Sequence, residues 1–282
     1  MEQILVTVFN GFLLGALYCL VSFGLTLIWG ILDIYNFSHG CFVAIGAYIA
    51  WALIFMVGLE FLSAAVLTLV ISFFLGVLVY KLVIQRVIEN LMLAIICTMM
   101  ISTFVENTIL LVWPHGALIK RLPSVSSVTY QIGFLILSGT DLVYALSAFG
   151  ILAFLWFMLK RTKLGLAMRA ITQDKDAASL MGISIPNVSM IVVGTSSFLA
   201  AFAGILLGSK EVMLPTMGSW PMWKASLITL FGGPGRIKEM AIAAFIISEI
   251  ELIVSLFLGY QWASVVLFLM LMVWMVIRKG GI

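Results

Sequence analysis

Long apolar stretches follow one another along nearly the whole chain, and only a few polar residues separate each from the next. Of the 282 residues, 63% are hydrophobic and 10% are charged, and the mean hydropathy is +1.23. A helix needs roughly 20 apolar residues to cross a membrane, so this length allows an all-α, polytopic bundle of about eight to nine membrane segments. The pattern excludes an ordinary water-soluble enzyme and predicts one transmembrane domain over residues 1–282.

The polar interruptions give the boundaries of the expected spans. The segments 41–57 and 222–231 are short, and the second is only about half a membrane deep at roughly 1.5 Å per residue. Residues 114–140 are expected to form an irregular segment, and no β-strand is expected anywhere. The remaining spans are 4–29, 61–80, 91–113, 142–159, 188–207, 241–258 and 262–277.

The distribution of Lys and Arg predicts the orientation, because these residues collect on the cytoplasmic side of membrane proteins. We place the long polar stretch 160–187 in the cytoplasm and let each span cross once. The C-terminus is then inside and the N-terminus outside, although re-entry of residues 30–57 without crossing would reverse the N-terminus. Most of the 15 basic residues lie inside in this arrangement, and the outer side receives Lys120, Arg121, Lys210 and Lys224.

Two breaks interrupt the apolar pattern, at 33–40 and at 232–235. Pro234 lacks a backbone donor, and the glycines around it favour irregular backbone. Asn36 and Ser38 are candidate N-caps for the helix over 41–57. Broken helices at membrane depth are tolerated where they line a cavity or pack inside protein, and in transporters they mark the solute path. Two short loops at the membrane surface are the alternative.

Polar residues within the apolar spans are the other candidates for a translocation path. A charge at the bilayer centre costs roughly 2.5–3.5 kcal/mol, so Glu106, Glu249 and Glu251 should face the interior of the bundle. Each of these glutamates has a purely structural alternative, in which it binds neighbouring backbone or hydroxyl groups. The candidate path residues are Asn36, Ser38, His39, Gly40, Glu106, Asn107, Gly232, Gly233, Gly235 and Glu251.

The stretch 160–187 is the only long polar segment of the chain. Gly165 and Gly182 are expected to flank a helix, and Pro186 to end any continuation. Apolar positions recur at Met168, Ile171, Ala178 and Met181, which is typical of an amphipathic helix outside the membrane. The helix could lie among lipid headgroups, but its polar part is mixed rather than basic. Docking into a groove on a protein partner is therefore favoured.

Several motifs in the sequence resemble those of a known family. Gly24-Leu-Thr-Leu-Ile-Trp-Gly30, then Asn36-Phe-Ser-His-Gly40 and Gly46-Ala-Tyr48 occur in the order typical of branched-chain amino acid ABC transporter permeases of the shorter type. A second signature is matched by Arg169-Ala170, Gln173-Asp174, Ala177-Ala178 and Leu180-Met-Gly-Ile183, and a G-G-x-G turn by 232–235. The chain resembles this family over nearly its whole length. Among the departures, Ser38 stands where the family usually has Ala, and Glu249 is an additional acid.

The resemblance implies a partner assembly. In this family the segment matched by Asp176–Gly182 is the coupling helix that seats on an ATPase. The residues carried over to ATPase coupling are Arg169, Gln173, Asp174, Asp176, Ala177, Ala178, Leu180, Met181 and Gly182. A second permease, two cytoplasmic ATP-binding subunits, a periplasmic solute-binding protein and membrane lipid are the expected partners. The expected location is the bacterial inner membrane, and the expected solutes are branched-chain or related small neutral amino acids.

Motifs that are absent from the sequence limit the possible functions further. The sequence has no G-x-x-x-x-G-K-[ST] loop, so this chain is not expected to be an ATPase by that motif. It is not expected to be an enzyme, to use a cofactor, to hold a metal or to bind nucleic acid. Two alternatives stay open: a urea or short-chain amide ABC permease, and an ion-coupled carrier or channel that would use Glu106, Glu249 and Glu251.

Overall fold

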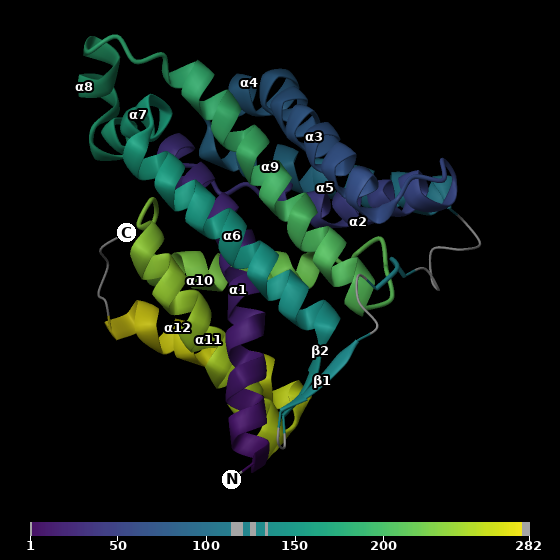
Figure 1. Cartoon of the computed structure of the whole chain (residues 1–282). Coiled ribbons are helices and arrows are strands. Elements are labelled where there is room, and N and C mark those ends of the chain that lie inside the picture. The colour runs from purple at the N-terminus through teal and green to yellow at the C-terminus, as the bar shows by residue number, and fades with distance from the viewer. Residues whose placement is uncertain (1, 114–120, 125–127, 133–134, 278–282) are drawn as a thin grey trace.

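The computed structural model describes residues 2–113, 121–124, 128–132 and 135–277, and it is a bundle of long helices (Figure 1). Lys120, expected on the outer side, lies outside these residues, and so do Arg278 and Lys279, which are among the basic residues expected inside. Within the described part, seven helical spans are long and apolar enough to cross a membrane. They are α1 (Glu2–Leu32), α3 (Phe61–Val79) with its continuation, α5 (Leu91–Val112), α6 (Gly139–Arg161), α9 (Ile185–Lys210), α11 (Ile237–Leu258) and α12 (Tyr260–Ile277).

Shorter helices complete the architecture. Two of them, α2 (His39–Phe55) and α10 (Ser219–Gly232), correspond to the two segments expected to be short and raise the number of membrane segments to the expected range. We call them the half-length helices, because they have 17 and 14 residues against 31 in α1. A π-turn, η1 (Tyr80–Ile84), and the short α4 (Gln85–Val87) continue α3. Outside the spans lie α7 (Lys163–Gln173) and α8 (Lys175–Leu180). The expectation of a polytopic helical membrane bundle is confirmed.

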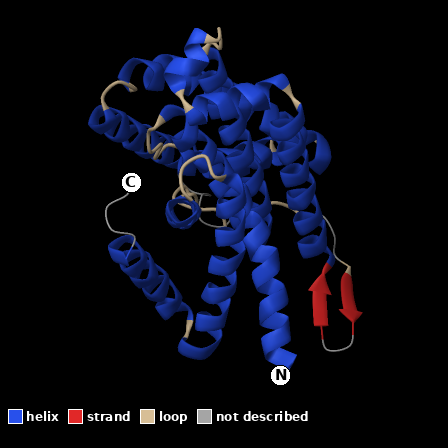
Figure 2. Ribbon diagram, turned by 90° about the vertical axis from the view of Figure 1, so that its left-hand side faces the viewer, coloured by secondary structure: helices blue, strands red, loops and turns tan. Residues whose placement is uncertain are grey.

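The expectation that strands are absent is wrong. Residues Thr129–Ile132 (β1) and Leu135–Ser138 (β2) form a two-stranded antiparallel hairpin in which Thr129 pairs with Ser138. Figure 2 shows that the hairpin projects from the end of the bundle that also holds the N-terminus. β-Branched and aromatic residues favour strands, and β1 has the sequence Thr-Tyr-Gln-Ile. The hydropathy pattern records spans and does not detect such a short pair.

Helix α9 lies at the centre of the bundle and packs against α1, α2 and α3. Small residues let the backbones approach closely. A methyl group placed on Gly204 would lie 1.9 Å from the carbonyl oxygen of Val43, and one placed on Gly46 would lie 2.4 Å from the Cα of Ala201. Such close helix contacts are common in membrane bundles. In lipid no hydrophobic driving force brings helices together, and small residues allow the close packing that does so. The α2–α9 contact fixes the position of the half-length helix.

Side-chain contacts define the two ends of the bundle. Lys175 on α8 pairs with Asp33 just after α1, so the C-terminal end of α1 lies beside the segment 160–187. Leu13 near the start of α1 lines a small cavity with Asp141 and Lys210, which pair with each other at the opposite end. α1 therefore runs from the end opposite 160–187 toward that segment. This matches the direction expected from single crossings.

Candidate functional site

The break between α1 and α2 takes the chain back into the bundle. A nitrogen of the His39 ring, Nε2, lies 2.9 Å from the carbonyl oxygen of Val21, about halfway along α1. Because α1 ends at Leu32 and α2 begins at His39, the chain reverses within six residues. α2 then runs from mid-bundle to the end that carries Lys210, since Tyr48 donates a hydrogen bond to the carbonyl of Met213. The break thus begins with the exposed Asp33 at the end of the bundle and leads inward to the buried residues Asn36 and Ser38.

Three predicted path residues hold this break together. The side-chain oxygen of Asn36 accepts hydrogen bonds from the backbone N–H of Ser38 at 3.1 Å and from its hydroxyl at 2.7 Å. The carbonyl of Val21 only accepts, so Nε2 of His39 donates to it, and in the neutral ring Nδ1 accepts from the hydroxyl of Ser196 at 2.9 Å. All three residues are buried and use their polar groups internally.

The expected capping by Asn36 and Ser38 is only partly correct. Ser38 occupies the N-cap position of α2, but its side chain makes no capping hydrogen bond. Its hydroxyl is already donated to Asn36, so it does not turn to the first turn of the helix. The Asn36 carboxamide stabilises the turn that precedes α2. The N–H of Phe37, in the same turn, donates to the hydroxyl of Thr98 on α5. The polar side chains thus stabilise the loop instead of the helix end.

The N-termini of the two half-length helices meet at a pair of glycines. A methyl group on Gly218, the residue before α10, would lie 1.9 Å from the carbonyl oxygen of Gly40 in the first turn of α2. A methyl group on Gly40 would lie 2.8 Å from the Cβ of Met222. Only glycine allows this approach. The positive ends of both helix dipoles therefore point to the same region of the bundle.

A cavity of about 170 Å³ opens beside this meeting point. Three hydroxyl groups and several apolar side chains surround it. The lining residues are Phe37, Gly40, Met99, Ser102, Thr103, Ser219, Met222 and Trp223. Of the path residues predicted for the break at 33–40, Gly40 lines the cavity, whereas Asn36, Ser38 and His39 do not.

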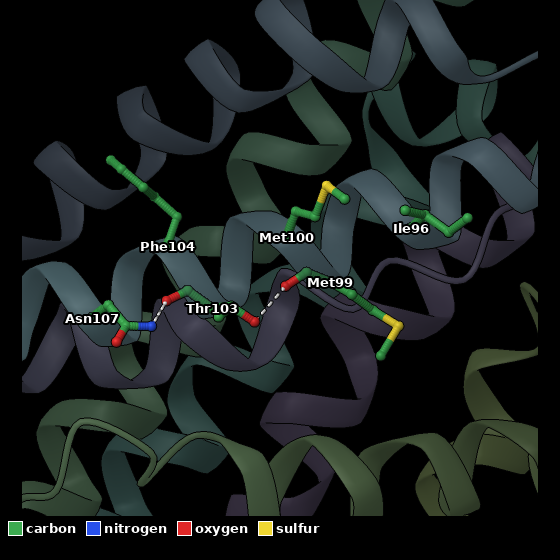
Figure 3. Close-up of a pocket in the computed structure, with 6 residues that line it drawn as sticks. All are labelled: Ile96, Met99, Met100, Thr103, Phe104 and Asn107. Atoms are coloured by element: carbon green, nitrogen blue, oxygen red, sulfur yellow. Dashed lines mark hydrogen bonds between the residues drawn. The ribbon is translucent and has the colours of Figure 1, made fainter.

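The cavity continues onto an open pocket of about 500 Å³ along α5 (Figure 3). Asn107, a predicted path residue, lines this pocket with Thr103, and its amide donates to the carbonyl of Thr103 at 2.8 Å. Glu106 is half-buried on the same helix and accepts a hydrogen bond from Ser102 at 3.3 Å. Met99 and Thr103 belong to both the cavity and the pocket.

The outer face of α5 is more polar than the outer faces of α3 and α12. Thr103, Asn107 and Thr108 are exposed in the middle of a membrane-length helix. By contrast, the exposed side chains of α3 between residues 64 and 79 are apolar, and so are those of α12 between 265 and 277. Polar side chains facing hydrocarbon are costly, and they are usually found against a cavity or another helix. On α5 these polar groups donate to backbone carbonyls one turn earlier: Thr103 to Met99, Asn107 to Thr103 and Thr108 to Phe104. The face is therefore more polar than the outer faces of α3 and α12, although these donors are satisfied within the helix.

The second break, at 232–235, has the irregular backbone that the sequence indicates. α10 ends at Gly232, and Gly233 and Gly235 have φ angles of 89° and 69°. A methyl group on Gly232 would lie 2.5 Å from the Cα of Met240, so this glycine brings α10 against α11. The three glycines shape the connection at the same end of the bundle as segment 160–187. None of them lines the cavity beside Gly40.

Glu251 belongs to a buried charged cluster. Tyr18 donates to one carboxylate oxygen at 2.9 Å, and Lys224 Nζ lies 2.5 Å from the other. The Lys224 side chain is 12% exposed and that of Glu251 is 3% exposed. The assignment of Lys224 to the outer side is therefore wrong, because an unpaired ammonium in α10 is drawn to a buried carboxylate. Lys224 and Tyr18 were missed by the sequence reasoning, although a single Lys in an apolar segment signals such a partner.

The segment 160–187 folds as two helices and not as the single expected one. Thr162 caps α7, because its hydroxyl accepts from the N–H of Gly165, which therefore lies inside the first turn. Asp174 separates the helices and caps α8 by accepting from Ala177 N–H at 2.9 Å. Gly182, with φ at 82°, ends α8. Pro186 lies in the first turn of α9, where a missing N–H costs nothing, instead of ending a helix.

The apolar residues of this segment divide between two faces. Met168, Ile171 and Ala178 form the predicted apolar stripe, but they are buried within the chain's own bundle and are not free to dock into a partner. Met181 was placed on the same stripe, but the side chains of Leu180 and Met181 are 89% and 84% exposed, because the turn at Gly182 directs them away. Of the residues carried over to ATPase coupling, Ala178 is buried. The others, Arg169, Gln173, Asp174, Asp176, Ala177, Leu180, Met181 and Gly182, are exposed.

Comparison with known proteins gives the class of the molecule. A family model described as "Branched-chain amino acid transport system / permease component" matches residues 7–276. The chain is therefore a multi-pass membrane permease, the transmembrane component of a transporter and not an enzyme. It belongs to the branched-chain amino acid transport permease family, and its location is the inner membrane.

The relatives support this assignment over nearly the full length. The chain is 28% identical to the high-affinity branched-chain amino acid transport system permease protein LivH of Escherichia coli K12, over 97% of this chain and 93% of the relative. It is 26% identical to the corresponding BraD protein of Pseudomonas aeruginosa, with the same coverage. A probable branched-chain amino acid transport permease protein of Methanocaldococcus jannaschii is 25% identical over 88% of this chain. No solved structure matches the chain.

Proposed function

We propose that this chain is the permease subunit of an ABC importer that moves branched-chain or related small neutral amino acids into the cell by alternating access. A periplasmic binding protein would deliver the solute, and two cytoplasmic ATPases would drive the cycle through the 165–182 segment. The single observation that carries this proposal is the exposed pair Leu180 and Met181 at the tip of α8. Large apolar side chains at the polar end of a membrane bundle indicate a protein-docking surface.

The path is proposed to run along the cavity at Gly40 and the polar face of α5. Hydroxyl groups of Ser102, Thr103 and Ser219 reach this cavity, and the two helix N-termini near Gly40 favour a carboxylate over a cation. Glu106 and Asn107 line the path on α5. Asn36, Ser38 and His39 support it by holding α2 in place, and Glu251 supports it by anchoring α10.

A second permease is proposed to face α5. The exposed polar residues Thr103, Asn107 and Thr108 make this face more polar than the outer faces of α3 and α12, and a paired permease enclosing a water-filled path would suit such a face. One coupling segment per chain also fits two permeases to two ATPases. Membrane lipid would cover the apolar faces of α3 and α12.

The contacts of Glu251 disfavour its use in an ion-coupled carrier. Glu251 is already paired with Lys224 and bonded to Tyr18, so its charge is not available to a transported cation. The exposed tip of α8 has no role in a carrier without an ATPase. A urea or short-chain amide cargo is the remaining alternative within the same machinery, and an uptake panel of labelled leucine, alanine and urea distinguishes them.

The test uses two glycines with the same backbone conformation. Gly182 and Gly58 have φ angles of 82° and 80°, and a methyl group on either would meet nothing within 4 Å. Gly182→Arg places a charge beside Leu180 and Met181, whereas Gly58→Arg imposes the same backbone strain on the loop after α2. We expect Gly182→Arg to abolish both ATPase co-purification and ATP-driven uptake, and Gly58→Arg to retain both. Unchanged co-purification and uptake in Gly182→Arg would refute the coupling role.

A further inference from the structure

The last turns of α1 lie against the second break, at the end of the bundle near α7 and α8. The N–H of Gly235, in the connection after α10, donates to the carbonyl of Thr26 on α1 at 3.3 Å. A methyl group placed on Gly30 would lie 2.5 Å from the Cα of Gly235. The last turns of α1, which lead into the break at 33–38, therefore touch the connection between α10 and α11. A force applied at this contact therefore reaches the C-terminal end of α1 and the C-terminal end of α10.

Helix α7 lies directly on this contact. A methyl group on Gly30 would lie 3.3 Å from Cγ2 of Thr172, and one on Gly235 would lie 3.2 Å from the same atom. Thr172 is in the last turn of α7, two residues before the break at Asp174. Its hydroxyl donates to the carbonyl of Arg169, so the methyl group is turned to the two glycines. The end of α7 thus touches both glycine contacts through one side chain.

Helix α8 holds the other side of the first break. Lys175, the first residue of α8, pairs with Asp33 at 2.5 Å. Asp33 directly follows α1 and has φ at 57°, the left-handed conformation that Asp and Asn tolerate best among the residues with a side chain. It is the first residue of the loop that leads to α2. The two side chains are 36% and 67% exposed, so the pair contributes little to folding stability.

We propose that Thr172 and Lys175 are positioning residues that transmit movement of α7 and α8 to both half-length helices. Thr172 acts through Gly235 on α10, and Lys175 acts through Asp33 on the loop before α2. This inference rests on the proposed function, in which partner ATPases move the 165–182 segment. It explains why a weak, exposed ion pair joins a protruding helix to a residue in an unusual backbone conformation.

The test measures coupling and not assembly. The complete transporter, with its ATPases and binding protein, is reconstituted in vesicles, and labelled leucine taken up per ATP hydrolysed is measured for Asp33→Asn, Lys175→Gln and their double variant. Asn keeps the left-handed conformation at position 33. We expect each single variant to lower uptake per ATP by roughly two- to fivefold, the range that an exposed ion pair allows. The double variant should be no worse than either single one, because both remove the same contact.

Two further variants complete the design. Thr172→Ser removes the methyl group but keeps the hydroxyl, and it should lower uptake per ATP while ATP hydrolysis and ATPase co-purification stay normal. Lys81→Gln is the matched control, because Lys81 is exposed on η1 and forms no ion pair with the described residues. It should behave as the wild type.

The outcomes separate the two proposals. Wild-type uptake per ATP in Asp33→Asn and Lys175→Gln, or additive losses in the double variant, would overturn the transmission role and leave the proposed function intact. Release of the ATPases by these variants would also overturn it, because they would then act on docking. Uptake by the wild-type complex without ATP would refute the proposed function, and the transmission role with it.

Discussion

Lys224 and Glu251 form a buried ion pair, with Nζ 2.5 Å from Oε1, that joins the half-length helix α10 to the long helix α11. Tyr18 on α1 donates to the other carboxylate oxygen. The consecutive helices α10 and α11 and the helix α1, which is far from both in the sequence, are thus fixed to one another at a single carboxylate. The pair lies on the side of α10 away from the cavity, whose α10 lining is Ser219, Met222 and Trp223.

Removing one partner of this pair should destabilise the bundle strongly. Lys224→Met leaves the carboxylate of Glu251 buried and unpaired, which typically costs about 3–5 kcal/mol. The double variant Lys224→Met with Glu251→Leu should recover much of this loss, because no charge is left uncompensated. Thermal unfolding of the purified protein in detergent measures both. Equal stability of the single variant and the wild type would contradict the assigned pairing.

The meeting of Gly40 and Gly218 should not tolerate a side chain. Gly218→Ala places a methyl group 1.9 Å from the carbonyl oxygen of Gly40, so α2 and α10 must move apart. We expect lower thermal stability and a loss of uptake. Gly150→Ala is the control: Gly150 lies within α6, and a methyl group there meets nothing within 4 Å. It should raise stability by about 0.5–1 kcal/mol, the usual helix preference of Ala over Gly.

Asn36 and Ser38 should differ in their sensitivity to substitution. Asn36→Leu removes an acceptor of two hydrogen bonds and leaves the buried N–H and hydroxyl of Ser38 unsatisfied, at about 1–3 kcal/mol for each group. Ser38→Ala removes one donor and should cost only about 1 kcal/mol. Unfolding temperatures of the two variants give the comparison. A fully stable Asn36→Leu variant with reduced uptake would instead indicate direct contact with the solute.

Water should reach the polar face of α5 in the assembled transporter. In a background with Cys97 replaced by Ser, a water-soluble maleimide should label Thr103→Cys at least about tenfold faster than Val66→Cys, because the reactive thiolate forms where water is present. Cys19 and Cys41 are buried and serve as the internal background. Similar labelling rates at the two positions would show that the α5 face is covered by lipid like that of α3.

The sequence predicted the spans well, because a membrane helix must be both long and apolar, and hydropathy records both requirements. It also located the two breaks, since Gly233 and Gly235 adopt positive φ angles that other residues avoid. It could not show where the breaks lead. The Gly40–Gly218 meeting and the Lys224–Glu251 pair join residues about 180 and 27 positions apart, and no local pattern specifies such contacts.

The sequence could not separate solute-contacting residues from structural ones, for a related reason. The sequence marks Asn36, Ser38 and His39 as unusual for an apolar segment, but their spacing does not say whether their polar groups face solute or one another. Only the positions of Val21 and Ser196 on two other helices decide this, and they satisfy His39 internally. Similarly, the helical period placed Met181 with the buried stripe, whereas the turn at Gly182 redirects it to solvent.

The bare tip formed by Leu180 and Met181 has a consequence for synthesis of the subunit. In the proposed assembly an ATPase covers these two side chains, and before assembly they are exposed to water, where apolar surfaces promote aggregation. A cell that makes this chain in excess of its partners would therefore accumulate an aggregation-prone unassembled subunit. The exposed tip of α8 thus makes balanced expression of all the subunits necessary.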